Sequence, residues 1–341
     1  MRILLTGGAG YVGSHVLLYC LENGHEVVVL DDFSNSSPEA LSRVELLTGR
    51  SVVLYRGDIR DGSLIRRILL GEKIDAVMHF AGLKAVPESV VKPLRYYDVN
   101  VNGSVILAQA MAATGVFRLV FSSTASVYGD QAAMPLTEDS PLGVPTNPYG
   151  RSKLMVEQIL DDLCAADPRW AVAVLRYFNP VGAHPSGRIG EDPQGEPANL
   201  VPYLMQVAVG RQPELKIFGD DYPTADGTGV RDYLHIMDLA EGHLAAMKRL
   251  VKRSGRHVWN LGTGRGYSVL ELVEAFTRVT GRRLPYSVAP RRPGDTAQCW
   301  ANPGLAEKEL GWKPRRGLEE MLIDHWRWQE RNPNGYMGDW V

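Results

Sequence analysis

The chain has 341 residues, enough for two substructures, because single hydrophobic cores stop growing near ~250–300 residues. Its apolar fraction of 45%, charged fraction of 22% and formal charge of −2 are ordinary for a globular protein and argue against a nucleic-acid-binding protein. Cys20, Cys164 and Cys299 are scattered, the histidines lack metal-ligand spacing, and no segment has the ~20 apolar residues of a membrane span. We therefore expect a cytosolic (cytoplasmic) protein without a metal site or a membrane anchor.

The first 31 residues predict a dinucleotide-binding unit. A short apolar strand, Arg2–Thr6, leads into the glycine loop Gly7-Gly8-Ala9-Gly10-Tyr11-Val12-Gly13, a helical pattern and a second strand that ends at Asp31. The glycines allow a tight turn and a close approach of the backbone to a pyrophosphate, which the helix N-terminus attracts. Asp31, eighteen residues after Gly13, can accept both ribose hydroxyls and would repel a 2′-phosphate. The unit therefore favours NAD over NADP.

Strands and helices continue to alternate as far as residue 179. Further strands are predicted at 51–55, 74–80, 117–121 and 171–176, and helices at 62–70, 93–114 and after Pro148. This order predicts an α/β fold with a doubly wound, Rossmann-type parallel sheet. Ligands of such sheets bind beyond the carboxyl ends of the strands, where the post-strand residues 58–59, 80–84 and 122–124 would lie.

One pentapeptide, Tyr149-Gly150-Arg151-Ser152-Lys153, opens the helix after Pro148. Tyr149 and Lys153 are one turn apart on the same face of that helix. A phenol titrates near pH ~10, and a neighbouring ammonium lowers that pKa towards the range of a general base. Most Tyr-x-x-x-Lys patterns are ordinary surface pairs, so the pair matters here only because a cofactor loop precedes it.

Beyond residue 179 the composition changes. Residues 179–232 are rich in proline and glycine, which predicts loops and short elements of a smaller mixed α/β, substrate-covering lobe. Asp238 is predicted to cap a helix that runs to Leu250, and 257–261 to form a strand that rejoins the main sheet. We expect an NAD-binding Rossmann domain at 1–179 with a returning segment near 233–262. The substrate-binding lobe would then comprise 180–232 and 263–341.

Several motifs together resemble the extended short-chain dehydrogenase/reductase superfamily: the glycine loop, the Tyr149–Lys153 segment, and residues 79–86, 175–184 and 229–233. Within it the chain is similar to the family of 4-epimerases that interconvert UDP-glucose and UDP-galactose in galactose metabolism. The resemblance implies oxidation at C4 through a 4-keto sugar, with NAD that stays bound. It makes Tyr149 the base, Lys153 its electrostatic partner, and Thr124 the hydrogen-bond partner of the reacting oxygen.

The same resemblance implies the ligand contacts. For NAD it indicates Gly7, Gly10, Tyr11, Val12, Gly13, Asp31, Asn35, Ser36, Asp58, Ile59, Phe80, Ala81, Gly82, Lys84, Asn100, Tyr149, Lys153 and Phe178. Asn100 is included because its neighbour Val99 stands where the bacterial pattern has Asn. For the UDP-sugar it indicates Lys84, Thr124, Tyr149, Asn179, Asn199, Leu200, Lys216, Phe218, Arg231, Arg292, Asp295 and Cys299.

Two further expectations follow from the resemblance. Cys299 stands where members restricted to unmodified hexoses have a bulky Tyr, which leaves room for an N-acetyl group and predicts activity on UDP-GlcNAc and UDP-GalNAc as well. A homodimer packed through helices at roughly 93–114 and 149–166 is also expected.

Three other functions compete with this one. A nucleotide-sugar 4,6-dehydratase needs an acid and a base beside Thr124, and the chain has Ala125-Ser126 there. A non-catalytic NAD sensor characteristically lacks the Tyr–Lys pair, which this chain keeps. A plain dehydrogenase exchanges its coenzyme, so turnover without added NAD distinguishes it from an epimerase.

Overall fold

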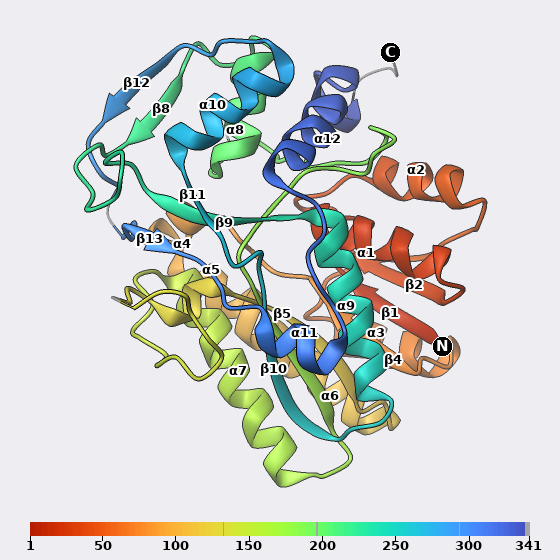
Figure 1. Ribbon diagram of the computed structural model, residues 1–341. Coiled ribbons are helices and arrows are strands. Elements are labelled where there is room, and N and C mark those ends of the chain that lie inside the picture. The colour runs from red at the N-terminus through yellow and green to blue at the C-terminus, as the bar shows by residue number, and fades with distance from the viewer. Residues whose placement is uncertain (132, 196, 293, 338–341) are drawn as a thin grey trace.

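The protein is built on a seven-stranded parallel sheet (Figure 1). The computed structural model describes residues 1–131, 133–195, 197–292 and 294–337. The strand order is β10-β6-β5-β4-β1-β2-β3, and all neighbours are parallel. The strands are β1 (Arg2–Thr6), β2 (Glu26–Asp31), β3 (Val53–Arg56), β4 (Ala76–His79), β5 (Arg118–Thr124), β6 (Ala171–Tyr177) and β10 (Gly255–Leu261). The predicted doubly wound α/β fold is therefore confirmed.

Helices cover both faces of this sheet. On one face lie α1 (Tyr11–Glu22), α2 (Pro38–Thr48) and α9 (Ile236–Leu250); on the other lie α3 (Gly62–Gly71), α6 (Gly103–Thr114) and α7 (Pro148–Ala166). The apolar run of strand β1 does not alternate between polar and apolar residues, because both faces of the strand are buried. Ile3 and Leu5 enter one core, and Leu4 between them enters the other. A strand buried on both faces needs apolar residues throughout.

A smaller lobe stands over the carboxyl edge of the sheet, at the top of Figure 1. It contains β7 (Asn179–Val181), α8 (Leu200–Ala208), β8 (Leu215–Phe218), β9 (Val230–His235), β11 (Gly266–Ser268), α10 (Val269–Thr280), β12 (Tyr286–Ala289), β13 (Gln298–Cys299) and α12 (Leu318–Arg331). Its core joins α8, α10 and α12. Helix α11 (Gly304–Leu310) packs instead on β10 and α9, where Ala306 is fully buried. In the described ranges no helix combines the length and the apolar character that crossing a bilayer requires.

Two predicted elements differ from the structure. The helix expected over residues 93–114 is divided into α5 (Pro93–Tyr96), a π-helical turn at Tyr97–Asn102, and α6. Asn100 lies in that turn, and its amide bonds the Leu83 main chain, a tertiary contact that accompanies the widened backbone.

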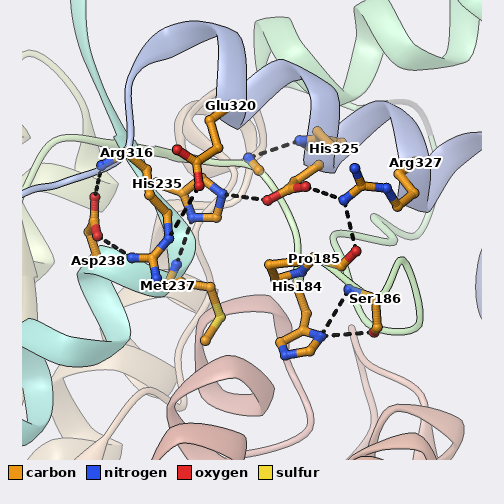
Figure 2. Close-up of polar contacts among 12 residues, drawn as sticks. His184, Pro185, Ser186, His235, Met237, Asp238, Arg316, Glu320, His325 and Arg327 are labelled. Atoms are coloured by element: carbon orange, nitrogen blue, oxygen red, sulfur yellow. Dashed lines mark hydrogen bonds and ion pairs between the residues drawn. The ribbon is translucent and has the colours of Figure 1, made fainter.

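The predicted cap at Asp238 was wrong. Helix α9 begins at Ile236, and its cap is His235, whose Nδ1 accepts the Met237 N–H at 3.0 Å. Asp238 is fully buried in the first turn of α9. It accepts the N–H groups of Arg315 and Arg316 at 2.9 and 3.0 Å and forms an ion pair with the Arg316 side chain (Figure 2). Its carboxylate therefore holds the segment that leads into α12 and does not cap the start of α9.

Candidate active site

A cavity of about 410 Å³ lies at the carboxyl ends of the central strands. Its described lining runs from the glycine loop, past the end of β5 and the start of α7, to Asn199 in the small lobe. This position is the topological switch point between β1 and β4, where ligands of doubly wound sheets bind. The predicted residues that line it are Gly7, Gly10, Tyr11, Val12, Gly13, Asp31, Asn35, Ser36, Asp58, Ile59, Phe80, Ala81, Gly82, Lys84, Thr124, Tyr149, Lys153, Phe178, Asn179 and Asn199.

The glycine loop at one end of the cavity fits a pyrophosphate. A Cβ at Gly13 would lie 2.1 Å from the Gly7 carbonyl oxygen, so only glycine allows the chain to fold back this tightly. Gly7 has φ +71°, the left-handed region that favours glycine. Gly10, at the N-cap of α1, makes no side-chain capping bond. The first N–H groups of α1 are thus left for an anionic ligand.

Asp31 at the end of β2 is fixed in the cavity wall. It accepts the Ala9 N–H at 2.9 Å, the Phe33 N–H at 2.9 Å and the Ser36 hydroxyl at 2.7 Å. The carboxylate is 7% exposed. A carboxylate offers about four acceptor sites, so Asp31 keeps capacity for a ribose hydroxyl.

Tyr149 and Lys153 occupy the first turns of α7. Asn147 caps this helix by accepting the Gly150 N–H at 2.9 Å, and Pro148 occupies the first helical position. The Lys153 ammonium donates to the Ser122 carbonyl at 2.9 Å, 4.9 Å from the centre of the Phe121 ring. Both side chains therefore face the cavity at the end of β5.

Burial dominates the electrostatics of this pair. It lowers the pKa of Lys153 to about 8, although Glu157 opposes the shift. It also raises the pKa of Tyr149, while a hydrogen bond with Thr124 acts in the opposite direction. The sequence argument gave Lys153 as the group that lowers this phenol's pKa. In the protein alone, desolvation of the phenol outweighs any such effect.

Thr124 ends β5 beside the Tyr149 phenol. Its Oγ1 accepts the Ser126 N–H at 3.2 Å, and the chain then enters a short 3-10 turn, Ala125–Tyr128. The Thr124 hydroxyl also donates to the Ser126 hydroxyl at 3.2 Å, so Ser126 fixes its position. Neither Ala125 nor Ser126 brings a carboxyl group to this turn.

The far wall of the cavity carries residues that the motifs did not reveal. Lys84 forms a 2.8 Å ion pair with Glu191, whose carboxylate is 4% exposed. The segment around Glu191 is held by the chain far beyond it: the Trp328 Nε1–H donates to the Glu191 carbonyl at 3.1 Å, and the Tyr336 N–H to the Asp192 carboxylate at 2.9 Å. Glu191, Asp192 and Tyr336 line the cavity only through these tertiary contacts, which no local sequence pattern predicts.

Tyr177 was also missed. It ends β6 directly before Phe178 and lines the same cavity. Its place at the end of a predicted strand was the available signal, because every neighbouring strand end contributes to the site.

Behind this wall, a buried polar cluster supports the loop after β7 (Figure 2). The Tyr11 hydroxyl donates to the Gly182 carbonyl at 2.7 Å, and the Gly182 N–H donates to His325 Nδ1 at 3.2 Å. Asp324, the residue before His325 in α12, lies 3.4 Å from His235 Nε2 and pairs with Arg327. Helix α12 thus fixes the loop on which Tyr11 rests.

Asn100 differs from the residues that line the cavity. It is 3% exposed, and its amide is occupied by the Leu83 main chain at 2.8 and 3.0 Å and by the Ser152 hydroxyl at 3.0 Å. The side chain that lines the cavity at this point is Val99. Asn100 is therefore placed as a brace between the 80–84 segment and α7.

The other predicted sugar-nucleotide residues lie in the small lobe. Arg292 lies 4.7 Å above the Phe218 ring and donates to Asp295 at 2.9 Å, so three of them are in contact. Arg231 and Cys299 are register partners on β9 and β13. The remaining two are Lys216 on β8 and Leu200 at the start of α8.

Comparison with known sequences matches residues 3–262 to the NAD dependent epimerase/dehydratase family. The chain belongs to this family. The UDP-glucose 4-epimerase of Bacillus subtilis (strain 168) is 58% identical over 336 residues, which cover 98% of this chain and 99% of that protein. The crystal structure of UDP-glucose 4-epimerase from Bifidobacterium longum in complex with NAD⁺ and UDP superposes with a TM-score of 0.96. It is 51% identical and covers 98% of this chain and 100% of that one.

A third relative is the UDP-Glc/GlcNAc 4-epimerase from Campylobacter jejuni. Its structure has a TM-score of 0.84 and 37% identity over 96% of this chain and 99% of that one. The cofactor in the family's name fits the residues of this cavity: the tight glycine turn, the uncapped N-terminus of α1 and the fixed Asp31 carboxylate.

Proposed function

We propose that the protein is an isomerase, a UDP-glucose 4-epimerase that interconverts UDP-glucose and UDP-galactose with NAD as its tightly held cofactor. Full-length similarity to the Bacillus subtilis enzyme and the fold shared with the NAD- and UDP-bound Bifidobacterium longum enzyme support this function. The observation that carries it is local: Tyr149, Lys153 and Thr124 line one cavity with the glycine loop and Asp31.

Each catalytic residue has one task. Tyr149 takes the proton of the sugar 4-hydroxyl and later returns it, while Thr124 donates a hydrogen bond to the reacting oxygen. Lys153 contributes a positive charge beside the phenol, and its position against the Ser122 carbonyl keeps it in reach of a ribose hydroxyl. When bound, NAD⁺ supplies the acceptor for the hydride that leaves C4 of the sugar, and a second positive charge that favours the phenolate.

The cavity must also let the oxidised sugar present its other face. After oxidation, the 4-keto sugar turns about its diphosphate and is reduced from the opposite side. Arg231 and Arg292 would hold that diphosphate, since guanidinium groups bind phosphates in bidentate fashion. Phe218 and Lys216 would flank the uracil, and Asp295 would bind the ribose. Asn179, Asn199 and Leu200 would surround the sugar.

Turnover without added coenzyme is the decisive test. Purified protein incubated with UDP-galactose should form UDP-glucose although no NAD is supplied, because the cofactor is regenerated in every cycle. Absence of turnover by protein in which bound NAD has been demonstrated would contradict the epimerase function. A requirement for stoichiometric added NAD, with a 4-keto product, would indicate a dehydrogenase.

We further propose that N-acetylated UDP-sugars are substrates. Cys299 is a small side chain that packs against the apolar cluster containing Phe178, one of the residues lining the cavity. Its strand partner is Arg231, the expected diphosphate ligand. A similar fold in an enzyme described as acting on both UDP-Glc and UDP-GlcNAc supports this wider range.

The variant Cys299→Tyr tests the substrate range. A phenol ring in place of the thiol should reduce kcat/KM for UDP-GlcNAc by about tenfold or more while largely sparing UDP-glucose, since the N-acetyl group needs the added space. Steady-state kinetics on all four sugar nucleotides measures the effect. Equal losses on both classes would show that Cys299 is only a packing residue.

An apolar groove supports a homodimer. It measures about 390 Å³ and is lined by Tyr97, Val101 and Asn102 of the π-helical turn, Val105 of α6 and Met155 of α7. Leu94 nearby is 80% exposed. A second copy of the chain, packed through these helices, would cover this surface. Sedimentation velocity should give a dimer for the wild type and a monomer for Met155→Glu; a monomeric wild type would contradict the proposal.

We also place the proposed enzyme in galactose metabolism, because its proposed substrates are UDP-galactose and UDP-glucose.

A further inference from the structure

A buried ion pair continues the face of α7 that carries the catalytic pair, Tyr149 and Lys153. Glu157 follows Lys153 by one helical turn, about 6 Å along the axis. Its carboxylate binds the guanidinium of Arg176 in β6, with 2.7 Å between Oε2 and Nη2 and 3.1 Å between Oε1 and Nε. The two side chains are 1% and 3% exposed. Because a buried ion pair often adds little stability over a well-packed apolar pair, stability alone does not account for it.

The ion pair is anchored to the end of β5. Glu157 accepts the hydroxyl of Ser123, which is fully buried and pairs with Arg176 in the register of β5 and β6. Ser123 lies between Ser122, whose carbonyl accepts the ammonium of the catalytic pair at 2.9 Å, and Thr124 at the cavity wall. Glu157 therefore fixes α7 at one position along the strand end that contributes to the site.

Arg176 extends this connection to the 3-10 turn that follows Thr124. Its Nη1 donates to the hydroxyl of Tyr128 at 3.2 Å, and its guanidinium carbon lies 5.0 Å from the centre of the Tyr128 ring. Tyr128 ends that turn, is fully buried, and donates in turn to Asn260 of β10 at 2.6 Å. The ion pair thus joins α7 to the chain on both sides of Thr124.

Glu157 also acts on Lys153 through its charge. Burial lowers the pKa of Lys153 to about 8, and the Glu157 carboxylate opposes that shift. Without this negative charge, the ammonium would lose its proton at lower pH.

Other titratable groups surround these residues. Arg256 of β10 donates to Glu157 at 3.2 Å and lies 3.9 Å from Asp161, further along α7. His79 of β4 is affected by the charge of Lys153, and it stays neutral because burial lowers its pKa to about 3. Helices α4 (Val86–Val91) and α5 and the π-helical turn also pack on α7, and their charged residues form ion pairs with partners outside the site: Glu88 with Lys92 and Arg95, and Asp98 with Arg60.

We propose, resting on the epimerase function above, that Glu157 is a positioning residue for the catalytic pair. Through Ser123 and Arg176 it fixes α7 against β5 and β6. The ammonium of the pair is thereby kept on the Ser122 carbonyl, and its phenol in the cavity at the end of β5. The charge of Glu157 keeps that ammonium protonated while the phenol exchanges a proton with the substrate.

Substitution of Glu157 by Gln tests this role. The amide keeps the length of the side chain and an acceptor for Ser123, but it no longer supports the charge of Lys153. Loss of the Lys153 proton at high pH ends its support of the phenolate. In NAD-loaded enzyme, the basic limb of the kcat–pH profile should therefore move about one pH unit lower, and kcat at about pH 7.5 should fall about tenfold. KM for UDP-galactose should change less than about twofold, because the expected UDP ligands are untouched.

Two further variants separate charge from position. Glu157→Asp restores the charge on a shorter side chain, so the basic limb should return towards its wild-type position. Ser123→Ala keeps the ion pair but removes its bond to β5, so kcat should fall about threefold while the limb stays in place. This variant keeps the test informative if Glu157→Gln folds poorly, and an unchanged kcat would contradict the positioning role.

The matched control is Asp238→Asn. Asp238 forms a buried ion pair with Arg316 in α9, on the face of the sheet opposite to α7. Its loss should lower Tm, as the loss of Glu157 does, without moving the pH profile.

Two outcomes would overturn the inference: a wild-type kcat and pH profile in folded, NAD-loaded Glu157→Gln, or the same shift of the basic limb in Asp238→Asn. Neither would affect the proposed function, which depends on turnover by the wild-type protein. Absence of that turnover would refute both.

Discussion

At the scale of single residues, the site depends on opposing effects on two buried groups. Burial raises the pKa of Tyr149 and lowers that of Lys153 to about 8, so it shifts each group towards its neutral form, while the Lys153 ammonium remains mostly charged near pH 7. In the proposed mechanism, the Lys153 ammonium and the positive charge of bound NAD⁺ would oppose this shift of the phenol and favour the phenolate.

Replacement of Tyr149 by Phe removes the base and leaves the helix unchanged. We expect epimerisation to fall by about 10³-fold, because general base catalysis contributes about 10²–10⁴-fold. The glycine loop and Asp31 are untouched, so NAD should remain bound. Coupled assay and measurement of bound nucleotide after denaturation test both parts. Substantial activity in the variant would assign the proton to another group.

At the scale of elements, the turn before α1 is the most constrained backbone in the site. Gly13 allows the first helical turn to pass against the Gly7 carbonyl, and no side chain fits in the 2.1 Å that a Cβ would leave. The helix N-terminus can approach the pyrophosphate only while that contact is kept.

The variant Gly13→Ala should therefore lose NAD. Backbone displacement at this turn moves the N–H groups of α1 away from the ligand, and the purified protein should contain less than about a tenth of the wild-type nucleotide. The control is Gly71→Ala at the end of α3, where a Cβ would have no heavy atom within 4 Å. Equal NAD content in the two variants would contradict this role of Gly13.

Local pattern was sufficient for most of the main sheet and for part of the site. The central residues of strands such as β1 and β6 are apolar because they are buried on both faces, and the Gly7–Gly13 turn and Pro148 at the start of α7 have local signatures. The π-helical turn around Asn100 could not be predicted, because it accompanies a contact with the Leu83 main chain. Nor could β13, whose two residues form a strand only by pairing with β9.

At the scale of the whole molecule, histidines are buried in several separate places. His15, His79, His243 and His325 have at most 2% of their surface exposed, and burial lowers their pKa values to about 3, 3, 4 and 4. Their unfolded value is near 6.5, so the unfolded chain takes up protons first as the pH falls. The contribution of these neutral histidines to the free energy of unfolding is fully present above about pH 6.5 and is lost progressively below it.

Chemical denaturation of the NAD-loaded protein at about pH 7.5 and about pH 5.5 should show this loss. Each such histidine contributes up to about 1.4 kcal/mol per pH unit below its unfolded pKa. His325→Gln keeps an acceptor for the Gly182 N–H but cannot titrate, so it should reduce the pH dependence by about that amount. An unchanged slope in this variant would show that His325 is charged in the folded protein.

The wall formed by Glu191, Asp192 and Tyr336 affects the order in which the parts of the site can form during synthesis of the chain. The glycine loop leaves the ribosome long before Trp328 and Tyr336, which hold the 190–192 segment in place. Strand β10, at one edge of the sheet, is likewise synthesised after the other six strands of that sheet. We therefore expect secure binding of NAD to require the C-terminal residues that complete this wall, and so to come late in biosynthesis.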